Sequence, residues 1–316
     1  MPRDLLLMRA GKSRKIRDGD RSVRELKDKG KRGAQKMGIW LCKRGLHDVQ
    51  VLSSPRADAK VSAEKLLKAA GSSAERITVD ARLAKADVNQ GLNLLAEANN
   101  STGPLLCVGH KRCIDNLADH IADQPTTLGA GELLHLRIPD GWSALFRGAG
   151  EIIEHVTPQS LPDGFPYPDI GWAERRERPA YYYSQSAVLP FRRMQGRLEI
   201  LIITSSKQTH WVLPKGIHEP GLTAADSAAK EALEEAGIRG RVDTVSIGRF
   251  HQEKWGAECS VDVFPMEITE ILPPEEWAEN HRGRCWVSVE TAVARLRNRG
   301  LAEIVARFRA TSSAGL

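Results

Sequence analysis

Closely spaced cysteines are missing from this chain of 316 residues. Its five cysteines are odd in number and scattered, and no two of them are separated by only two residues: Cys42, Cys107, Cys113, Cys259 and Cys285. We therefore expect neither a disulfide framework nor a structural zinc site. The same pattern predicts a reducing, cytoplasmic location.

Long apolar runs and low-complexity tracts are also absent. No segment approaches the roughly 20 consecutive apolar residues of a membrane span, so we expect no membrane partner. The N-terminal segment has only a short apolar run before its charges begin, which is not the pattern of a signal peptide. Hydrophobic residues make up 41% of the chain and charged residues 27%, which excludes a disordered protein. The length fits two domains of about 150 residues each.

Acidic residues are scarce at the N-terminal end. Residues 1–60 contain 17 lysines and arginines against 7 acidic residues, a net charge of +10 in a chain whose total is +6. Such an excess indicates either a polyanionic partner or a solvated, lysine-rich helix face, and the sequence leaves both open. Residues 12–36 lack the interleaved aromatic residues that stack on bases, so nucleic acid is not the expected partner. A homo-oligomer stays open.

Short apolar runs alternate with segments of helical spacing in the first half of the chain. The predicted strands are 4–8, 49–52 and 105–108, and the predicted helices are 22–41, 62–70 and about 114–122. This alternation favours an α/β domain with a parallel-rich sheet flanked by helices. In such sheets ligands bind at the carboxyl ends of the strands, which here are 9–11, 53–54 and 109–110.

A proline-rich segment separates the two halves. We predict an N-terminal domain over 1–155, a linker over 156–179 and a C-terminal domain over 180–316. The predicted strands of the second half are 182–190, 198–204, 210–213, 242–250 and 260–269, with a strong helix over 223–236 and a helical tail over 289–309. These elements favour an α+β domain with a mixed sheet.

Three glutamates gather on the strong helix of the second half. Glu231 lies on the same helical face as Glu234 and Glu235, because residues three and four apart are neighbours. Like charges on one face destabilise a helix, and a divalent cation would reverse that cost. Carboxylate oxygens select Mg²⁺ or Mn²⁺. The alternative, a solvated acidic face, is common on surface helices.

The segment from Gly216 to Ile238, with its glutamates, resembles the Nudix hydrolase box in register and without gaps. It departs from the family pattern at Leu222, where a Glu is expected, and at Lys230, where an Arg is expected. The flanking segments also resemble the family, and Trp277 to Trp286 is similar to the late tryptophan and arginine segment of its diphosphoinositol and diadenosine polyphosphate branch.

This resemblance implies the Nudix fold, a mixed sheet between helices, and hydrolysis of a phosphoanhydride bond with Mg²⁺ or Mn²⁺. It makes Glu231, Glu234 and Glu235 the expected metal ligands and catalytic residues. Glu253 or Glu258 would be a general base outside the helix. The expected substrate-binding residues are all basic: Arg192, Arg193, Lys215, Arg282 and Arg284.

Three strand-end segments of the first half resemble the histidine phosphatase superfamily, most closely its phosphohistidine phosphatase branch. They read LLLMRAGKS, LSSPRADAKVSAEKLL and LLCVGHKRCIDNLA. The resemblance implies a phosphoglycerate mutase-like fold. Ala10 stands where the family has its nucleophilic His, and Asp58 stands where it has a phosphate-binding Arg. Arg9 and His110 remain, so we expect an inactive, vestigial pocket, whether Ala10 is natural or engineered.

Several functions stay open at this stage. The leading one is a Mg²⁺-dependent Nudix hydrolase of nucleoside or dinucleoside polyphosphates or related diphosphate compounds, with a pseudo-phosphatase domain. A housecleaning nucleoside triphosphate pyrophosphohydrolase is the second. A non-catalytic sensor or scaffold that binds phosphorylated ligands is the third, and phosphate removal by His110 alone is the fourth.

Overall fold

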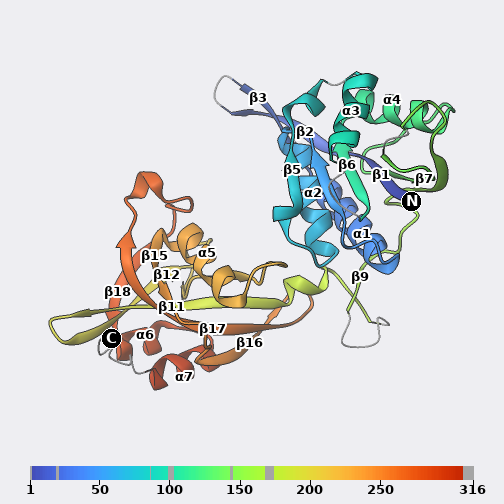
Figure 1. The fold of residues 1–316 in the computed structure, drawn as a ribbon. Helices are drawn as coiled ribbons and strands as arrows, with labels where there is room; N and C mark the ends of the chain where they lie inside the picture. The colour runs from blue at the N-terminus through green and yellow to red at the C-terminus, as the bar shows by residue number, and fades with distance from the viewer. Residues whose placement is uncertain are drawn as a thin grey trace, which may run out of the picture. The chain divides into compact units, whose positions relative to one another are not determined.

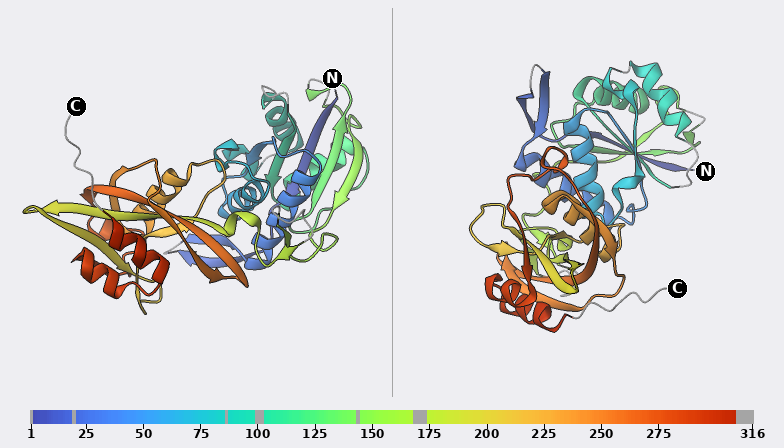
Figure 2. Two further views of the ribbon diagram at one scale, coloured as in Figure 1. Left: turned by 90° about the horizontal axis from the view of Figure 1, so that it is seen from below. Right: turned by 90° about the vertical axis from the view of Figure 1, so that its left-hand side faces the viewer.

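The computed structural model of the chain describes residues 2–18, 21–85, 87–98, 103–142, 145–167 and 174–308. The chain divides into two compact units, unit 1 (Met1–Phe165) and unit 2 (Pro166–Leu316), drawn in Figures 1 and 2. The domain limits expected from the sequence stay predictions. Among the described residues, no helix is both long and apolar enough to cross a bilayer.

Unit 1 contains a six-stranded sheet with the order β5-β4-β6-β1-β7-β8. In chain order its strands are β1 (Arg3–Arg9), β4 (Gln50–Ser53), β5 (Ile77–Val79), β6 (Leu105–Gly109), β7 (Leu133–Ile138) and β8 (Glu151–Val156). The first four pair in parallel, whereas β7 and β8 run antiparallel. The parallel-rich α/β architecture predicted for the first half is confirmed.

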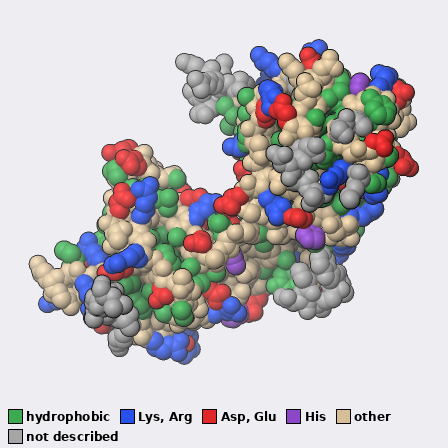
Figure 3. Space-filling view, viewed as in Figure 1, with side chains coloured by type: hydrophobic (Ala, Val, Ile, Leu, Met, Phe, Trp, Pro, Cys, Tyr) green, Lys and Arg blue, Asp and Glu red, His purple; other side chains and the backbone are tan. Residues whose placement is uncertain are grey.

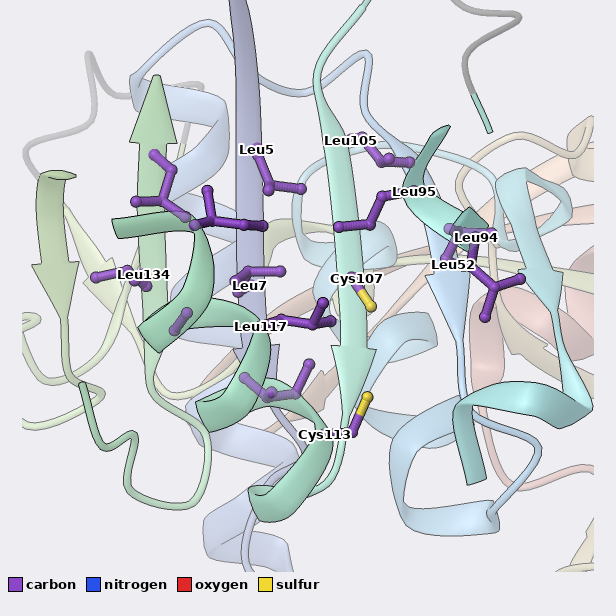
Figure 4. Close-up of a cluster of buried hydrophobic side chains, with 14 of the residues drawn as sticks. Leu5, Leu7, Leu52, Leu94, Leu95, Leu105, Cys107, Cys113, Leu117 and Leu134 are labelled. Atoms are coloured by element: carbon purple, nitrogen blue, oxygen red, sulfur yellow. The ribbon is translucent and has the colours of Figure 1, made fainter. Parts of the chain in front are cut away.

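Helices cover both faces of this sheet. They are α1 (Asp28–Lys43), α2 (Ala57–Ala69), α3 (Val88–Glu97) and α4 (Lys111–Ala122), with short 3₁₀ turns at Ala74–Arg76 and Ala81–Ala84. Alternate residues of β1 face opposite sides: Leu5 and Leu7 pack with α3 and α4 (Figure 4), and Leu6 and Met8 pack with α1 and α2. Because both faces are buried, β1 reads as a continuous apolar run in the sequence.

The helix predicted over 22–41 is wrong at its beginning. Residues up to Leu26 belong instead to a hairpin of β2 (Ser13–Asp18) and β3 (Arg21–Leu26), and α1 begins only at Asp28. The residues of β3 have helical spacing, but β2 satisfies their backbone hydrogen bonds. The spacing of apolar residues along the sequence carries no information about pairing with another strand.

Unit 2 contains an eight-stranded mixed sheet with the central order β13-β12-β11-β17-β15. Its strands are β11 (Ser184–Met194), β12 (Arg197–Thr204), β13 (Trp211–Val212), β14 (Lys215–Ile217), β15 (Ile238–Val242), β16 (Gly248–Lys254), β17 (Ala257–Ile271) and β18 (Arg284–Ser288). β11 and β17 are parallel, and the other pairs are antiparallel. A two-stranded ribbon, β9 (Phe165–Pro166) and β10 (Arg175–Arg176), precedes them.

Three helices lie on this mixed sheet, as predicted for an α+β domain. α5 (Ala224–Ala236) packs on one face, and α6 (Val289–Arg295) and α7 (Arg299–Arg307) pack on the other. Short 3₁₀ turns lie at Ala180–Tyr182 and Pro274–Glu276. The predicted helical tail is interrupted at Leu296, whose extended backbone bridges to Trp211 of the edge strand β13. The predicted strand over 242–250 is also split, between β15 and β16.

Gly38 provides a test of the close crossing between α1 and α2. A Cβ atom at this position would lie 2.1 Å from the carbonyl oxygen of Leu66. We expect Gly38→Ala to lower the free energy of unfolding of unit 1 by about 2 kcal/mol, because the backbone of α2 cannot move aside.

A matched control lies in the same helix. At Gly33 a Cβ atom would meet only Pro158, at 3.4 Å. Gly33→Ala should raise the free energy of unfolding by about 0.5 kcal/mol through helix propensity. Urea unfolding followed by circular dichroism compares the two variants. Equal free energies of unfolding for Gly38→Ala and Gly33→Ala would contradict the close approach of α1 and α2 at Gly38.

Candidate active site

The acidic helix α5 has well-formed ends. The side chain of Thr223 accepts a hydrogen bond from the backbone N–H of Asp226 at 3.1 Å, which caps the first turn. Gly237 ends the helix in the left-handed region, with φ of 59°. A Cβ atom at Gly237 would lie 2.7 Å from the ring of Trp277, so only glycine fits there. These ends fix which residues of the helix face β14.

Glu231 lies against the backbone of β14. Gly216 makes this approach possible, since a Cβ atom there would lie 1.9 Å from the Glu231 carboxyl carbon. Burial raises the pKa of Glu231 to about 7, and the nearby carboxylates of Glu235, Glu234 and Glu219 add to the shift. No described residue forms an ion pair with this carboxylate. It is therefore a half-buried acid that lacks a cation.

Glu235, one turn further along, is held on two sides. One carboxylate oxygen accepts the backbone N–H of Lys215 at 3.0 Å, and the other accepts Arg282 Nη2 at 2.6 Å. The Glu235 and Arg282 side chains are only 13% and 7% exposed. Burial raises the pKa of Glu235, while the Lys215 N–H and Arg282 act in the opposite direction. Arg282, for which substrate binding is predicted, thus forms an ion pair with a glutamate of α5.

Glu234 differs from its two neighbours because its side chain is exposed. Its nearest cation is Lys230, at 3.9 Å. The Lys230 ammonium lies 2.9 Å from both carboxylate oxygens of Glu219. Glu219 thus supplies an acidic partner for Lys230, although the sequence pattern places that acid at Leu222. The sequence analysis did not predict a role for Glu219. Its position in the loop before α5, three residues from Leu222, is the feature that could have indicated one.

The segment from Trp277 to Arg284 covers the C-terminal end of α5. The Trp277 indole N–H donates to the carbonyl of Glu234 at 3.2 Å. Arg284 donates to the carbonyls of Ala236, Gly237 and Leu272 at 3.0–3.3 Å, and its guanidinium lies 4.3 Å from the Trp277 ring centre. Arg284 therefore caps α5 through carbonyls that have no partner within the helix.

The remaining predicted basic residues fall in two places. Lys215 lies on β14 beside the glutamates. Arg192 pairs with Glu199 at 2.8 Å and lies over the Trp286 ring at 3.8 Å. Along β11, Arg192 and Arg193 follow the position opposite Lys215 by five and six residues, roughly 16–20 Å of strand. The structure does not bring these two arginines to the glutamates.

The β16–β17 hairpin contributes further charged groups. Glu253 and Glu258 face each other across it, both exposed, and Glu258 lies 3.1 Å from His251. Lys254 was not expected from the sequence. Desolvation of its ammonium, followed by repulsion from Lys215, lowers the pKa of Lys254, while the charges of Glu235 and Glu231 raise it. Its ammonium is therefore electrostatically coupled to the acidic site.

A divalent cation fits the donor chemistry here. Glu231 and Glu235 present carboxylate oxygens from one side of α5, and Glu231 has no cation of its own. Hard oxygen donors of this kind suit Mg²⁺ or Mn²⁺. The side chains as they lie bring no group of three or more His, Cys, Asp or Glu ligands together within the described residues. The residues that could hold the ion are thus Glu231 and Glu235, with Glu234 nearby.

In unit 1, Asp58 occupies the centre of the expected phosphatase pocket. Its buried carboxylate lies 3.0 Å from His110 Nε2, 2.9 Å from Ser13 Oγ and 3.8 Å from Arg56 Nε. Burial acts to raise the pKa of Asp58, but the bonds to His110 and Ser13 and the charge of Arg56 outweigh it and lower that pKa. The carboxylate of Asp58 thus occupies His110, Ser13 and Arg56 from within the unit.

The other two predicted members of this pocket lie at the end of β1. Ala10 is 5% exposed, and its backbone N–H donates to Gly109. Arg9 donates to the carbonyl of Leu128 at 2.9 Å. The structure therefore gathers the pocket residues at the carboxyl ends of β1, β4 and β6, with no hydroxyl, thiol or imidazole at position 10.

Comparison with known proteins finds a family model that matches unit 2. The family model of the NUDIX domain matches residues 183–308. Diphosphoinositol polyphosphate phosphohydrolase 3-beta from Bos taurus is 31% identical over 119 residues, which are 36% of this chain and 70% of the relative. Nudix hydrolase 12, mitochondrial, from Arabidopsis thaliana is 32% identical over 106 residues, 31% of this chain and 51% of the relative. The chain spans about half the length of such plant relatives.

The similarities to the following two solved structures cover half of this chain or less. The protein histidine phosphatase SixA complexed with tungstate is similar with a TM-score of 0.43 and 19% identity, covering 50% of this chain and 99% of that chain. The C. elegans Ap4A hydrolase is similar with a TM-score of 0.34 and 18% identity, covering 39% of this chain and 93% of that chain.

The pair of Arg282 and Glu235 predicts a stability effect. We expect Arg282→Met to destabilise unit 2 by about 3 kcal/mol, because it leaves a buried carboxylate without its cation. Adding Glu235→Gln should recover part of the loss, since the charge is then removed. Calorimetric unfolding of the two variants checks this, and an unchanged transition in Arg282→Met would refute the anchoring role.

Asp58 predicts a pH dependence in unit 1. Its pKa in the folded state lies below the ordinary 3.8, so its ionised form stabilises the fold above that value. Relative to Asp58→Asn, the parent should be more stable by about 2 kcal/mol at neutral pH. This difference should vanish as the pH falls through the lowered pKa. Urea unfolding of both proteins from pH 7 to pH 2 measures the difference, and a difference that stays constant over this whole range would contradict the assignment.

Proposed function

Since this chain belongs to the Nudix family, we propose that unit 2 hydrolyses a phosphoanhydride bond in a phosphate-rich compound. The chain covers only part of each relative's length, so the reaction and the substrate are both proposals. The relative from Bos taurus is named a diphosphoinositol polyphosphate phosphohydrolase, which makes that substrate class one candidate. Dinucleoside polyphosphates are the other leading candidate.

The observation that carries the proposal is the state of Glu231. A half-buried carboxylate whose pKa is raised to about 7, beside two further carboxylates and with no cation of its own, is destabilised as it stands. A bound divalent cation would remove that cost. We propose that Glu231 and Glu235 hold Mg²⁺ or Mn²⁺ and that Glu234 is a third ligand or the base.

When bound, the cation would neutralise pyrophosphate oxygens and lower the pKa of a water molecule. The chain's own residues have separate roles in this scheme. Lys215 and Lys254, whose charges interact with Glu235, would bring positive charge to the phosphates. Arg282 and Arg284 keep the acidic helix in place and are positioning residues. A general base on the β16–β17 hairpin, Glu253 or Glu258, stays part of the proposal.

A basic cavity of unit 2 lies at the β13 edge of the sheet, beside the end of α6. It measures ≈340 Å³, and its lining includes Trp211, Arg295 and Arg297 but no carboxylate. The two arginines flank the extended residue Leu296, and both line the cavity. Neither has a carboxylate partner among the described residues, and the planar guanidinium group of arginine suits phosphate.

The second candidate function for unit 2 is that of a housecleaning nucleoside triphosphate pyrophosphohydrolase.

We propose that unit 1 is a phosphatase-like domain without phosphatase activity. A methyl group at Ala10 cannot accept a phosphoryl group. His110 and Arg56 are tied to Asp58, whose negative charge repels a phosphate. Unit 1 would then have a role other than catalysis.

A cytoplasmic location is likewise a proposal. All five cysteines are free thiols in the structure. Burial raises the pKa of Cys107, Cys113 and Cys259, which keeps these thiols protonated and inert. A protein with this thiol pattern suits a reducing compartment.

Glutamate substitutions test the proposed metal site. We expect Glu231→Gln and Glu235→Gln each to lower Mg²⁺-dependent hydrolysis by about 100-fold or more, because each removes a ligand charge. A panel should include diphosphoinositol polyphosphates, dinucleoside polyphosphates and nucleoside triphosphates. Glu275→Gln, an exposed acid outside the site, serves as the control.

Two outcomes would count against this proposal. Equal rates for parent and variants would refute the metal-site assignment. Tight ligand binding by the parent, with no turnover on any substrate, would favour the non-catalytic sensor.

Phosphoryl transfer tests the proposed inactivity of unit 1. We expect no labelled phosphate to attach to the parent chain after incubation with a radiolabelled phosphohistidine protein, because no nucleophile is present at position 10. Label on His110 would show that this imidazole acts alone and would refute the proposal.

A further inference from the structure

A cavity of ≈580 Å³ lies in unit 1 beside the vestigial phosphatase pocket. One wall is a face of α1, formed by residues 29, 32, 33 and 36, which helical spacing places together. The other walls are the loop after β1 at residues 11–12, the turn at 130–132 and the segment 158–163. We call it the α1 pocket. It contains none of the residues predicted for the phosphatase pocket.

Glycines allow these segments to form a cavity instead of a filled core. Gly131 has φ of 84°, a conformation that favours glycine, and a Cβ atom there would lie 3.3 Å from Pro158. A Cβ atom at Gly11 would lie 3.0 Å from the Gly30 carbonyl oxygen. The backbone at these glycines therefore forms part of the cavity wall, and polar side chains form the rest.

Those side chains are mostly basic. Lys12, Lys29, Arg32 and Lys36 line the α1 pocket, against two acids, Glu132 and Asp163. Four of the 17 lysines and arginines among residues 1–60 thus line one cavity.

Both acids already have partners. Asp163 lies 2.8 Å from the Lys36 ammonium, which also donates to the carbonyls of Pro158 and Leu161. Glu132 accepts the N–H of Gly129 at 2.8 Å and lies 3.0 Å from His155. These contacts hold the walls together and neutralise Lys36, and neither acid pairs with Lys12 or Lys29.

Lys12 and Lys29 are exposed, and neither forms an ion pair with a described residue. Two ammonium groups at one cavity repel each other unless an anion lies between them. The volume lies within the range of small-molecule sites, and the position beside the end of β1 is where α/β sheets bind ligands.

From this geometry we propose that the α1 pocket binds a small molecule through its phosphate group, held by Lys12 and Lys29. The site replaces the vestigial pocket, where Asp58 occupies the place of the anion, as the phosphate-recognising feature of unit 1. It is independent of hydrolysis in unit 2.

Calorimetric titration of the full chain tests the site. The probes are adenosine 5′-monophosphate and inorganic phosphate, with a chelator present so that metal-dependent hydrolysis is silent. We expect Lys12→Ala/Lys29→Ala to weaken binding of the tighter probe by about tenfold or more. Lys15→Ala/Lys43→Ala removes the same two charges from exposed positions of unit 1 outside the pocket, and it should bind within about twofold of the parent.

The two probes separate the sources of the phosphate. Tighter binding of adenosine 5′-monophosphate assigns the site to a phosphorylated organic compound, and equal binding assigns it to free phosphate. The proposal is overturned if neither probe binds the parent, or if the Lys12→Ala/Lys29→Ala chain binds as the parent does. It is also overturned if both double variants lose affinity equally, since the effect is then one of net charge.

Discussion

The acidic site of unit 2 depends on one buried ion pair, between Arg282 and Glu235. Two charged groups that are 7% and 13% exposed are costly to bury, and the 2.6 Å contact between them offsets that cost only if both stay in place. Arg282 belongs to the segment before β18, whereas Glu235 belongs to α5. The pair therefore joins two elements that are far apart in the sequence, and it determines how the acidic helix faces β14.

The neighbouring contacts act on the same helix in other ways. Arg284 and Trp277 bind the last carbonyls of α5, and the pair of Lys230 and Glu219 fastens its middle to the preceding loop. With the helix held at its end and middle, Glu231 stays half-buried against glycine despite the neighbouring negative charges. The surroundings of α5 thus maintain an electrostatically unfavourable arrangement, which is the usual physical basis of a cation site.

Charge has the opposite role in unit 1. There the carboxylate of Asp58 lies inside the pocket and binds His110, so that the pocket is neutralised from within. Other basic residues, Lys12, Lys29, Arg32 and Lys36, line the α1 pocket instead. Part of the positive charge that the sequence shows as an average over residues 1–60 therefore lies at a cavity separate from Asp58.

The sequence by itself determined the fold classes, the acidic helix with both its caps, and the alanine at position 10, which carries no nucleophilic group. These features depend on local spacing and on residue chemistry, which the linear order of residues contains. The tertiary structure decided the partners. It pairs Arg282 with Glu235, places Arg284 against the last carbonyls of α5, pairs Lys230 with Glu219, and joins Asp58 to His110. Such pairs depend on which side chains the folded backbone brings within a few ångströms, and residues distant in the sequence leave no periodic pattern of that contact.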